Sequence, residues 1–332
     1  MVEARRITSK DVAQRAGVAQ ATVSYVLNGK GSISTATRNH VMRVATELGY
    51  RPNLAARSMR THQSGRLAVV TGVYDFNSAD IITGAAEVAE QNGYFLEVHS
   101  YSGSAENQSQ QILELARTKQ VEGILCFALV LDEVMAQMPA DFPMILPDNY
   151  AYGMHSAGAL ADATPVIVLM EKLAALGHKR FLHVAGSEKF ATAVARQEAY
   201  LATIERLNLE SLGVIAGDWS AESGMAAIAE LPDDAPPIAV IAANDRVAVG
   251  VMRAAALRGW RIPDDLSVTG WDNYDVSAFL TPPLTTVSFD RIEAGRREMR
   301  RLIALMRQEQ PPPEHAPLHS IVWRDSTAAP TA

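Results

Sequence analysis

The sequence predicts an all-α head containing a helix–turn–helix, followed by an α/β core of two lobes with parallel sheets flanked by helices. Three observations lead to this fold class. Residues 7–28 form two short helical patterns broken at Gly17. The balance of charge changes sign after residue 62. Beyond that residue, short apolar runs alternate with helical patterns, which favours parallel sheets covered by helices on both faces.

The first two helices carry clear local signals. Thr8 is placed to cap the first helix, and Asp11 three residues later suits a capping box. Apolar residues recur at helical spacing and predict one buried stripe per helix. These stripes are Val12, Ala13 and Ala16 in the first helix, and Val23, Val26 and Leu27 in the second.

The buried stripe of the second helix leaves Gln20, Ala21, Ser24 and Tyr25 pointing outward. A short helix with a small, uncharged, polar outer face suits the major groove of DNA, where base edges are read by hydrogen bonds and methyl contacts. The alternative is a plain helical hairpin with no DNA contact.

A third helix completes the predicted head, residues 1–52. Ser34 suits its N-cap, an apolar stripe runs from Val41 to Leu48, and Gly49 ends it. Residues 1–62 hold ten Lys and Arg against three acidic residues, a net charge of +7. The whole chain has a net charge of −7, which leaves −14 for the remainder. A basic head on an acidic body indicates a phosphate-binding module attached to a second unit.

The body is long enough for two packed lobes. Predicted strands lie at 67–70, 94–98, 123–127, 180–184, 239–242 and 266–270. The change of lobe is expected near residue 163. The alternative is a single contiguous α/β enzyme domain.

Several segments closely resemble the LacI/GalR family of bacterial transcription regulators. They are residues 11–24, 26–28, 50–53 and 55–59, and the resemblance extends to about residue 325. It implies a helix–turn–helix head, a hinge helix that forms on operator DNA, and a core like a periplasmic sugar-binding protein. The expected boundaries are a hinge at 53–65, an N-terminal lobe at 66–163 and 290–316, a C-terminal lobe at 164–289 and 317–326, and a disordered tail at 327–332.

The resemblance also assigns DNA contacts. It implies base reading by Gln20, Ala21 and Tyr25. The backbone contacts it implies are Thr22, Ser24, Asn28, Ser34 and Asn53. The predicted hinge helix is too short to persist alone in water, and the alternative for this segment is a linker without DNA contact. In the family, paired hinge helices enter the minor groove and a leucine wedges between bases. Met59 takes that position here, beside Ala56, Arg57 and Arg60.

Ligands of open parallel sheets bind beyond the carboxyl ends of the strands. Arg196 and Asp272 could hold a pair of sugar hydroxyls, and Trp219 and Phe289 could stack on a sugar ring. Tyr74, Asp245 and Trp271 also follow strands, but Asp245 could simply cap a helix and the tryptophans could be packing. With the family's positions added, the expected effector-binding residues are Asp75, Phe76, Phe127, Phe190, Thr192, Arg196, Trp219, Asn244, Asp272 and Phe289.

The sequence lacks the usual catalytic motifs. It contains no nucleophile elbow, P-loop or His-Glu-x-x-His pattern, and His178 has no partner at metal-ligand spacing. We therefore expect no enzyme, cofactor or metal. Two alternatives are a sugar-binding receptor, which would need a signal peptide, and a sugar-processing enzyme. No secretory signal or membrane span is apparent, and Cys126 is expected to be a buried apolar filler.

These observations predict a repressor in the bacterial cytoplasm. It would bind palindromic double-stranded operator DNA, and a small-molecule effector, a sugar or a sugar derivative, would control it. No C-terminal leucine heptad is present, so we expect a homodimer rather than a tetramer.

Overall fold

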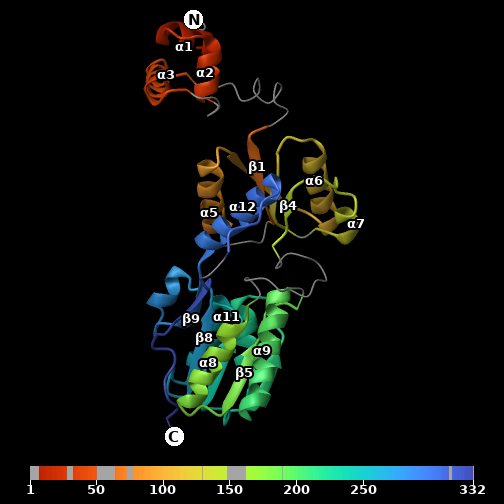
Figure 1. Cartoon of the computed structure of the whole chain (residues 1–332). Helices are drawn as coiled ribbons and strands as arrows, with labels where there is room; N and C mark the ends of the chain where they lie inside the picture. Colours follow the sequence, from red (N-terminus) through yellow and green to blue (C-terminus); the bar gives the residue numbers. More distant parts are fainter. Residues whose placement is uncertain are drawn as a thin grey trace, which may run out of the picture. The chain divides into compact units, whose positions relative to one another are not determined.

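The computed structural model describes residues 7–27, 33–50, 64–72, 78–128, 130–147, 162–188, 190–313 and 316–331. It divides into two compact units, Met1–Gly65 and Arg66–Ala332, here called the head and the body (Figure 1). Each unit has hydrophobic clusters of its own.

The head contains helices α1 (Ser9–Ala16), α2 (Gln20–Leu27) and α3 (Thr35–Glu47). The predicted capping box is confirmed, because Thr8 accepts from the Asp11 amide while the Asp11 carboxylate accepts from the Thr8 amide. Gly17 ends α1 with a φ of 66°, a left-handed conformation that glycine adopts without strain. Ser34 caps α3 through the Thr37 amide, as expected.

One small core holds α1, α2 and α3 together. Its members are Val12, Ala13, Ala16, Val23, Val26, Val41, Val44 and Ala45. They belong to the apolar stripes that the helical spacing predicts, with Leu48 packed at the margin, while the side chain of Leu27 lies outside the described part of the chain. The polar face of α2 is therefore turned away from this core.

The first lobe of the body is built on a four-stranded parallel sheet in the order β2-β1-β3-β4. Its elements are β1 (Arg66–Gly72), α5 (Ser78–Gln91), β2 (Phe95–Tyr101), α6 (Ala105–Arg117), β3 (Ile124–Phe127), α7 (Asp132–Met135) and β4 (Met144–Ile145). A late helix, α12 (Arg291–Arg307), packs against α5 and the β3–β4 side of the sheet (Figure 1).

The second lobe has a six-stranded sheet in the order β10-β9-β8-β7-β5-β6, in which only β10 is antiparallel. Its elements are α8 (Thr164–Ala175), β5 (Arg180–Val184), α9 (Ala191–Leu207), β6 (Glu210–Ile215), α10 (Ala221–Ala229), β7 (Ile238–Ala242), α11 (Asp245–Leu257), β8 (Leu266–Trp271), the 3₁₀ helix η2 (Asp275–Phe279), β9 (Thr285–Phe289) and β10 (His319–Val322). Apolar residues of β5, β7 and β8 fill the layer beneath α10 and α11.

The predicted strands are all present, but β4, β6, β9 and β10 were not predicted. β6 and β10 lie at the edges of the sheet and bury only part of their side chains, so they lack a continuous apolar run. β9 is buried, yet it begins with two threonines after Pro282 and Pro283, which makes it read as a turn. Among the described residues, none forms a helix suited to crossing a membrane.

The last residues do not form the disordered tail expected from residue 327. The Ala328 amide donates to Ser267 Oγ at 3.2 Å, and its carbonyl lies 2.9 Å from His178 Nε2. Thr331 donates to the Asp264 carbonyl at 3.0 Å. Polar side chains at the start of β8 and in the turn before β5 thus satisfy the backbone of Ala328. His178 is buried, and Cys126 is the expected buried filler, with its pKa raised to about 12 by burial.

Candidate functional site

The exposed face of α2 is the first candidate site. Gln20 and Ala21 are exposed, and Tyr25 is 51% exposed, while Thr22 and Ser24 are half-buried. Gln20 Nε2 donates to Ser9 Oγ at 3.0 Å, which holds the amide at the start of the helix. The hydroxyl of Ser34 already caps α3. The other expected DNA contacts, Asn28, Asn53, Ala56, Arg57, Met59 and Arg60, lie outside the described residues.

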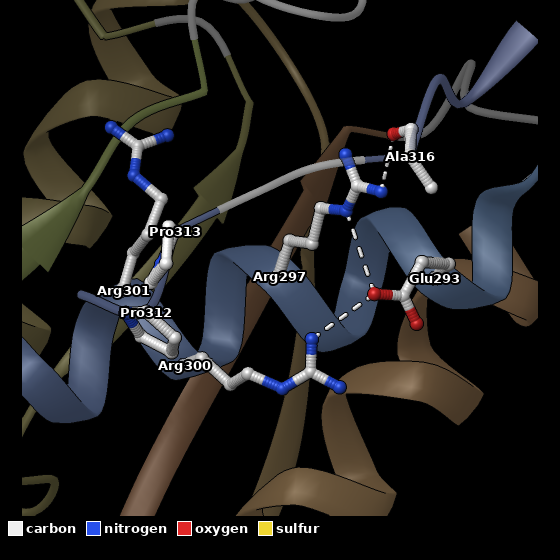
Figure 2. A pocket seen from close by; sticks show the side chains of 7 residues that line it. All are labelled: Glu293, Arg297, Arg300, Arg301, Pro312, Pro313 and Ala316. Carbon is white, nitrogen blue, oxygen red and sulfur yellow. Dashed lines mark hydrogen bonds and ion pairs between the residues drawn. The ribbon is translucent and has the colours of Figure 1, made fainter.

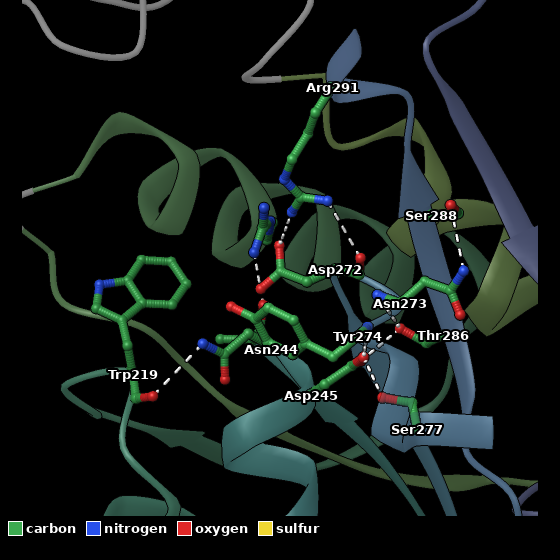
Figure 3. A network of polar contacts seen from close by, with 12 residues as sticks. Trp219, Asn244, Asp245, Asp272, Asn273, Tyr274, Ser277, Thr286, Ser288 and Arg291 are labelled. Atoms are coloured by element: carbon green, nitrogen blue, oxygen red, sulfur yellow. Dashed lines mark hydrogen bonds and ion pairs between the residues drawn. The ribbon is translucent and has the colours of Figure 1, made fainter. Parts of the chain in front are cut away.

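The second candidate site lies at the carboxyl ends of β7, β8 and β9, where a polar cluster gathers (Figure 3). Asn244 directly precedes α11, and Asp272 directly follows β8. Arg196 and Thr192 come from the first turns of α9, and both are buried. The parallel order of the sheet places these strand ends at one edge, which is where ligands of such folds bind.

Arg196 is deeply buried, with only 8% of its surface exposed. Its Nη1 donates to the Ala243 carbonyl at 2.5 Å. The guanidinium carbon lies 3.8 Å from the ring centre of Trp271 and 5.7 Å from that of Trp219. Burial lowers the pKa of Arg196 to about 10, which leaves it charged at neutral pH. Trp271 is therefore a packing residue whose face supports a cation.

Asp272 forms an ion pair with Arg291, a residue that the sequence reasoning missed. The guanidinium Nη2 of Arg291 lies 2.8 Å from Asp272 Oδ1, and its Nη1 donates to the Asp272 carbonyl at 3.3 Å (Figure 3). Burial raises the pKa of Asp272, while Arg291 and Arg196 oppose that rise. The backbone of Asp272 has a φ of 111°, a strained conformation for a side-chain-bearing residue, and such strain gathers at ligand sites.

Trp219 and Phe190 form an aromatic pair beside Arg196. Their rings meet edge to face with centroids 5.9 Å apart. Trp219 also has a positive φ, 69°, and Asn244 Nδ2 donates to its carbonyl at 3.4 Å. Asn244 in addition caps α11 by accepting from the Val247 amide at 2.8 Å. Asn244 thus joins the start of α11 to the loop that carries Trp219.

Asp245 lies fully buried behind this cluster and positions its loop. Its carboxylate accepts from the Tyr274 amide at 2.9 Å, from Ser277 Oγ at 2.5 Å and from Thr286 Oγ1 at 2.5 Å (Figure 3). The alternative role, capping α11, belongs to Asn244 instead. Asp245 therefore fixes the segment between β8 and η2, which carries Asp272.

The remaining expected effector residues do not all lie in this cluster. Phe289 is buried at the end of β9, with its ring centre 4.8 Å from that of His319. Burial lowers the pKa of His319 to about 4. A cavity of about 410 Å³ adjoins Phe289, Arg291 and His319. Phe127 belongs to the core of the first lobe. Tyr74, Asp75 and Phe76 lie outside the described residues.

A separate pocket of about 260 Å³ lies on α12, and the sequence reasoning did not foresee it. Figure 2 shows Arg297 and Arg300 converging on Glu293, at 3.4 and 3.0 Å from the same carboxylate oxygen. Arg297 also donates to the Ala316 carbonyl at 2.7 Å. Within the described part of the chain, no group of acidic, histidine or cysteine side chains could hold a metal ion.

Comparisons with known proteins agree with the geometry of both units. Residues 8–53 match the family described as bacterial regulatory proteins, lacI family, and residues 170–327 match the periplasmic binding protein-like domain. The transcriptional repressor CytR of Escherichia coli (strain K12) is 32% identical over 309 residues, which cover 90% of this chain and 89% of CytR. The transcriptional regulator CelR of Thermobifida fusca is 31% identical, covering 91% and 92% of the two chains.

Solved structures show the same fold. The Lac repressor dimer bound to operator and an anti-inducer matches with a TM-score of 0.75 and 27% identity, covering 98% of this chain and all of that chain. The CelR–cellobiose complex matches with a TM-score of 0.63 and 26% identity, covering 97% of this chain and all of that chain. The helix–turn–helix head and the two-lobed α/β core are thereby confirmed. The prediction that the chain is a regulator and not an enzyme is also confirmed, because the relatives are transcriptional repressors and regulators. The chain belongs to the LacI family of bacterial transcription regulators.

Proposed function

We propose that this regulator represses transcription by binding a palindromic operator as a homodimer, and that a sugar or sugar derivative controls its affinity for DNA. The observation that carries this proposal is the exposed set Gln20, Ala21 and Tyr25 on a separately folded head, in the same chain as the strand-end cluster around Arg196 and Asp272. The relative CytR is a transcriptional repressor, and the relative CelR forms a complex with cellobiose.

On the operator, Gln20 would bond an adenine edge with both atoms of its amide, and Ala21 would contact a thymine methyl. Thr22, Ser24, Asn28, Ser34 and Asn53 would contact phosphates. Ala56, Arg57, Met59 and Arg60 would enter the minor groove, with Met59 as an apolar wedge. Two heads on one palindrome supply the contact area that a single short helix lacks.

In the body, the effector would lie against Arg196, Asp272 and Asn244, with Trp219 and Phe289 facing its ring. Thr192 and Phe190 would complete the side formed by the second lobe, and Asp75 and Phe76 would face it from the first. An effector changes operator affinity only by its different affinities for two arrangements of the body, typically by about 1–3 kcal/mol. The protein would act in the bacterial cytoplasm, where its operator lies.

The test is a titration of fluorescent DNA from the region upstream of the protein's own gene, with and without a panel of sugars. We expect tight binding to one palindrome and a change in affinity with one class of sugar. The control is the same DNA with one half-site scrambled. Equal binding to scrambled DNA, or an affinity that no sugar changes, would contradict the proposal.

A further inference from the structure

We propose that the effector carries a negatively charged oxygen group, a carboxylate or a phosphate, which Arg291 and Arg196 bind together. This inference rests on the proposed function, because it concerns the same site. The sequence predicts a pair of side chains at this site, the guanidinium of Arg196 and the carboxylate of Asp272. The structure adds a second guanidinium, that of Arg291.

The described cluster contains more positive than negative charge. Arg196 and Arg291 both act on the single carboxylate of Asp272. The neighbouring carboxylate, Asp245, already accepts three hydrogen bonds from uncharged donors. A third guanidinium, Arg324, lies behind the loop and donates to Asn273 Oδ1 at 2.7 Å. Among the described side chains of the cluster, Arg196 and Arg291 thus share the carboxylate of Asp272.

The site also offers a ligand more hydrogen-bond donors than acceptors. The carboxylate of Asp272, which would accept from sugar hydroxyls, is already bonded to Arg291 at 2.8 Å. Arg196 has five N–H donors, and one of them donates to the Ala243 carbonyl. A ligand therefore meets an excess of charged donors. Carboxylate and phosphate oxygens are the acceptors that match a guanidinium in both geometry and charge.

The surroundings strengthen this preference. Trp271 and Phe289 line the cluster, and both arginines act to lower the pKa of the neighbouring His319, which burial brings to about 4. His319 is therefore neutral near pH 7. Asp162 lies 3.9 Å from His319, but its side chain is 44% exposed and well solvated. Asp80 and Asp290 also line the cavity beside Arg291, but both are exposed to solvent. Apolar walls weaken screening, so cations that share one carboxylate attract an anion more strongly there than they would at the surface.

The test uses calorimetric titration with matched series of pentoses, hexoses and nucleosides, each in neutral, carboxylate and phosphate form. We expect one charged form to bind the wild type while its neutral parent binds at least tenfold more weakly, and the better charged form identifies the group. Arg291→Gln should weaken that binding about ten- to hundredfold, as expected for a lost charged hydrogen bond. Arg291→Lys should restore part of it. Arg301→Gln, on the same helix and paired with Glu298, is the matched control.

The outcomes separate this inference from the proposed function. A neutral parent that binds as tightly as its charged forms, and loses affinity in Arg196→Ala, would overturn the inference and leave sugar control standing. If no compound bound a protein that still recognises its operator, both would be overturned. Because Arg291→Gln also leaves Asp272 less well paired, a second test needs only the wild type. Affinity for a charged effector must fall with added salt, and an affinity independent of salt would refute the inference.

Discussion

The indole of Trp219 packs over Gly186, the second residue after β5, and fills the space that a side chain at Gly186 would need. A β-carbon there would overlap the six-membered part of the ring. The lack of a side chain at Gly186, in the loop after β5, thus fixes the place of the Trp219 ring in the loop after β6. This relationship gives the first prediction.

Gly186→Ala should lower effector affinity about tenfold, a loss of about 1.4 kcal/mol, and leave ligand-free operator affinity unchanged. The added methyl would push the indole away from Arg196 and Asn244. Calorimetric titration of the effector measures the first effect, and operator titration measures the second. In a Trp219→Ala background the same change should have little further effect. An additive loss in the double variant would show that Gly186 acts by another route.

Gln20→Ala should change base preference at one operator position per half-site, by about 1–3 kcal/mol. The amide lies on the exposed face of α2, where it would reach a base edge. Binding to a set of operators that differ at single positions measures this change. Ser9→Ala is the control, because it removes the 3.0 Å hydrogen bond to Gln20 and leaves the amide in place. A uniform loss across all operators would make Gln20 a backbone contact.

Phe279→Glu should weaken dimerisation by about 2 kcal/mol or more. Phe279 is 83% exposed at the end of η2, and Val276 is exposed beside it. An apolar patch of this kind fits an interface between two bodies, and a charge in it would remain buried and unpaired. Sedimentation at micromolar concentration reports the change, with Phe279→Leu as the control. A wild-type tetramer would refute the predicted homodimer, and an unchanged dimer in Phe279→Glu would place the interface elsewhere.

Arg196→Ala should abolish the effector's influence on operator binding while leaving ligand-free DNA affinity nearly unchanged. The lost response corresponds to a coupling of about 1–3 kcal/mol. Operator titration with and without effector measures it. Arg206→Ala is the matched control, because Arg206 lies on the same helix in an exposed ion pair with Glu171. A full response in Arg196→Ala would put the effector site elsewhere.

Unfolding free energy should fall as the pH is lowered from 7 to 5. Burial lowers the pKa of His183 to about 4 and also lowers the pKa values of His178 and His319. Each lowered pKa means that the folded state resists a proton that the unfolded chain accepts near pH 6.5. The stabilisation is therefore complete above pH 6.5 and is lost as the pH falls toward 4.

For His183 alone the loss between pH 7 and pH 5 should be about 1–2 kcal/mol. Urea unfolding at the two pH values measures it. His183→Phe keeps a ring against Tyr200, whose centroid lies 5.3 Å away, and removes the titrating group. The pH dependence should shrink by that amount, and an unchanged dependence would assign the loss to other groups.

Local signals were enough to predict the head. Thr8, Asp11 and Gly17 act on their own helix, so a few neighbouring residues determine the outcome. The candidate site of the body depends on contacts between distant segments. Arg291 follows β9, and because β9 starts with threonines after two prolines, neither the strand nor the arginine at its end was expected. Trp219 and Asp272 also have positive φ values, which the residue types at those positions do not predict.

Both lobes of the body are assembled from separated stretches of chain, since α12 packs on α5 and β10 pairs with β9. During translation the residues of the head are synthesised first. The two sheets of the body are complete only after α12 and β10, near the end of the chain, have been synthesised. A nonsense mutation between codons 66 and 291 would therefore leave the coding sequence of the head intact and remove α12, Arg291 and β10 together. Such alleles would encode a head without a complete, effector-controlled body to pair it on the operator.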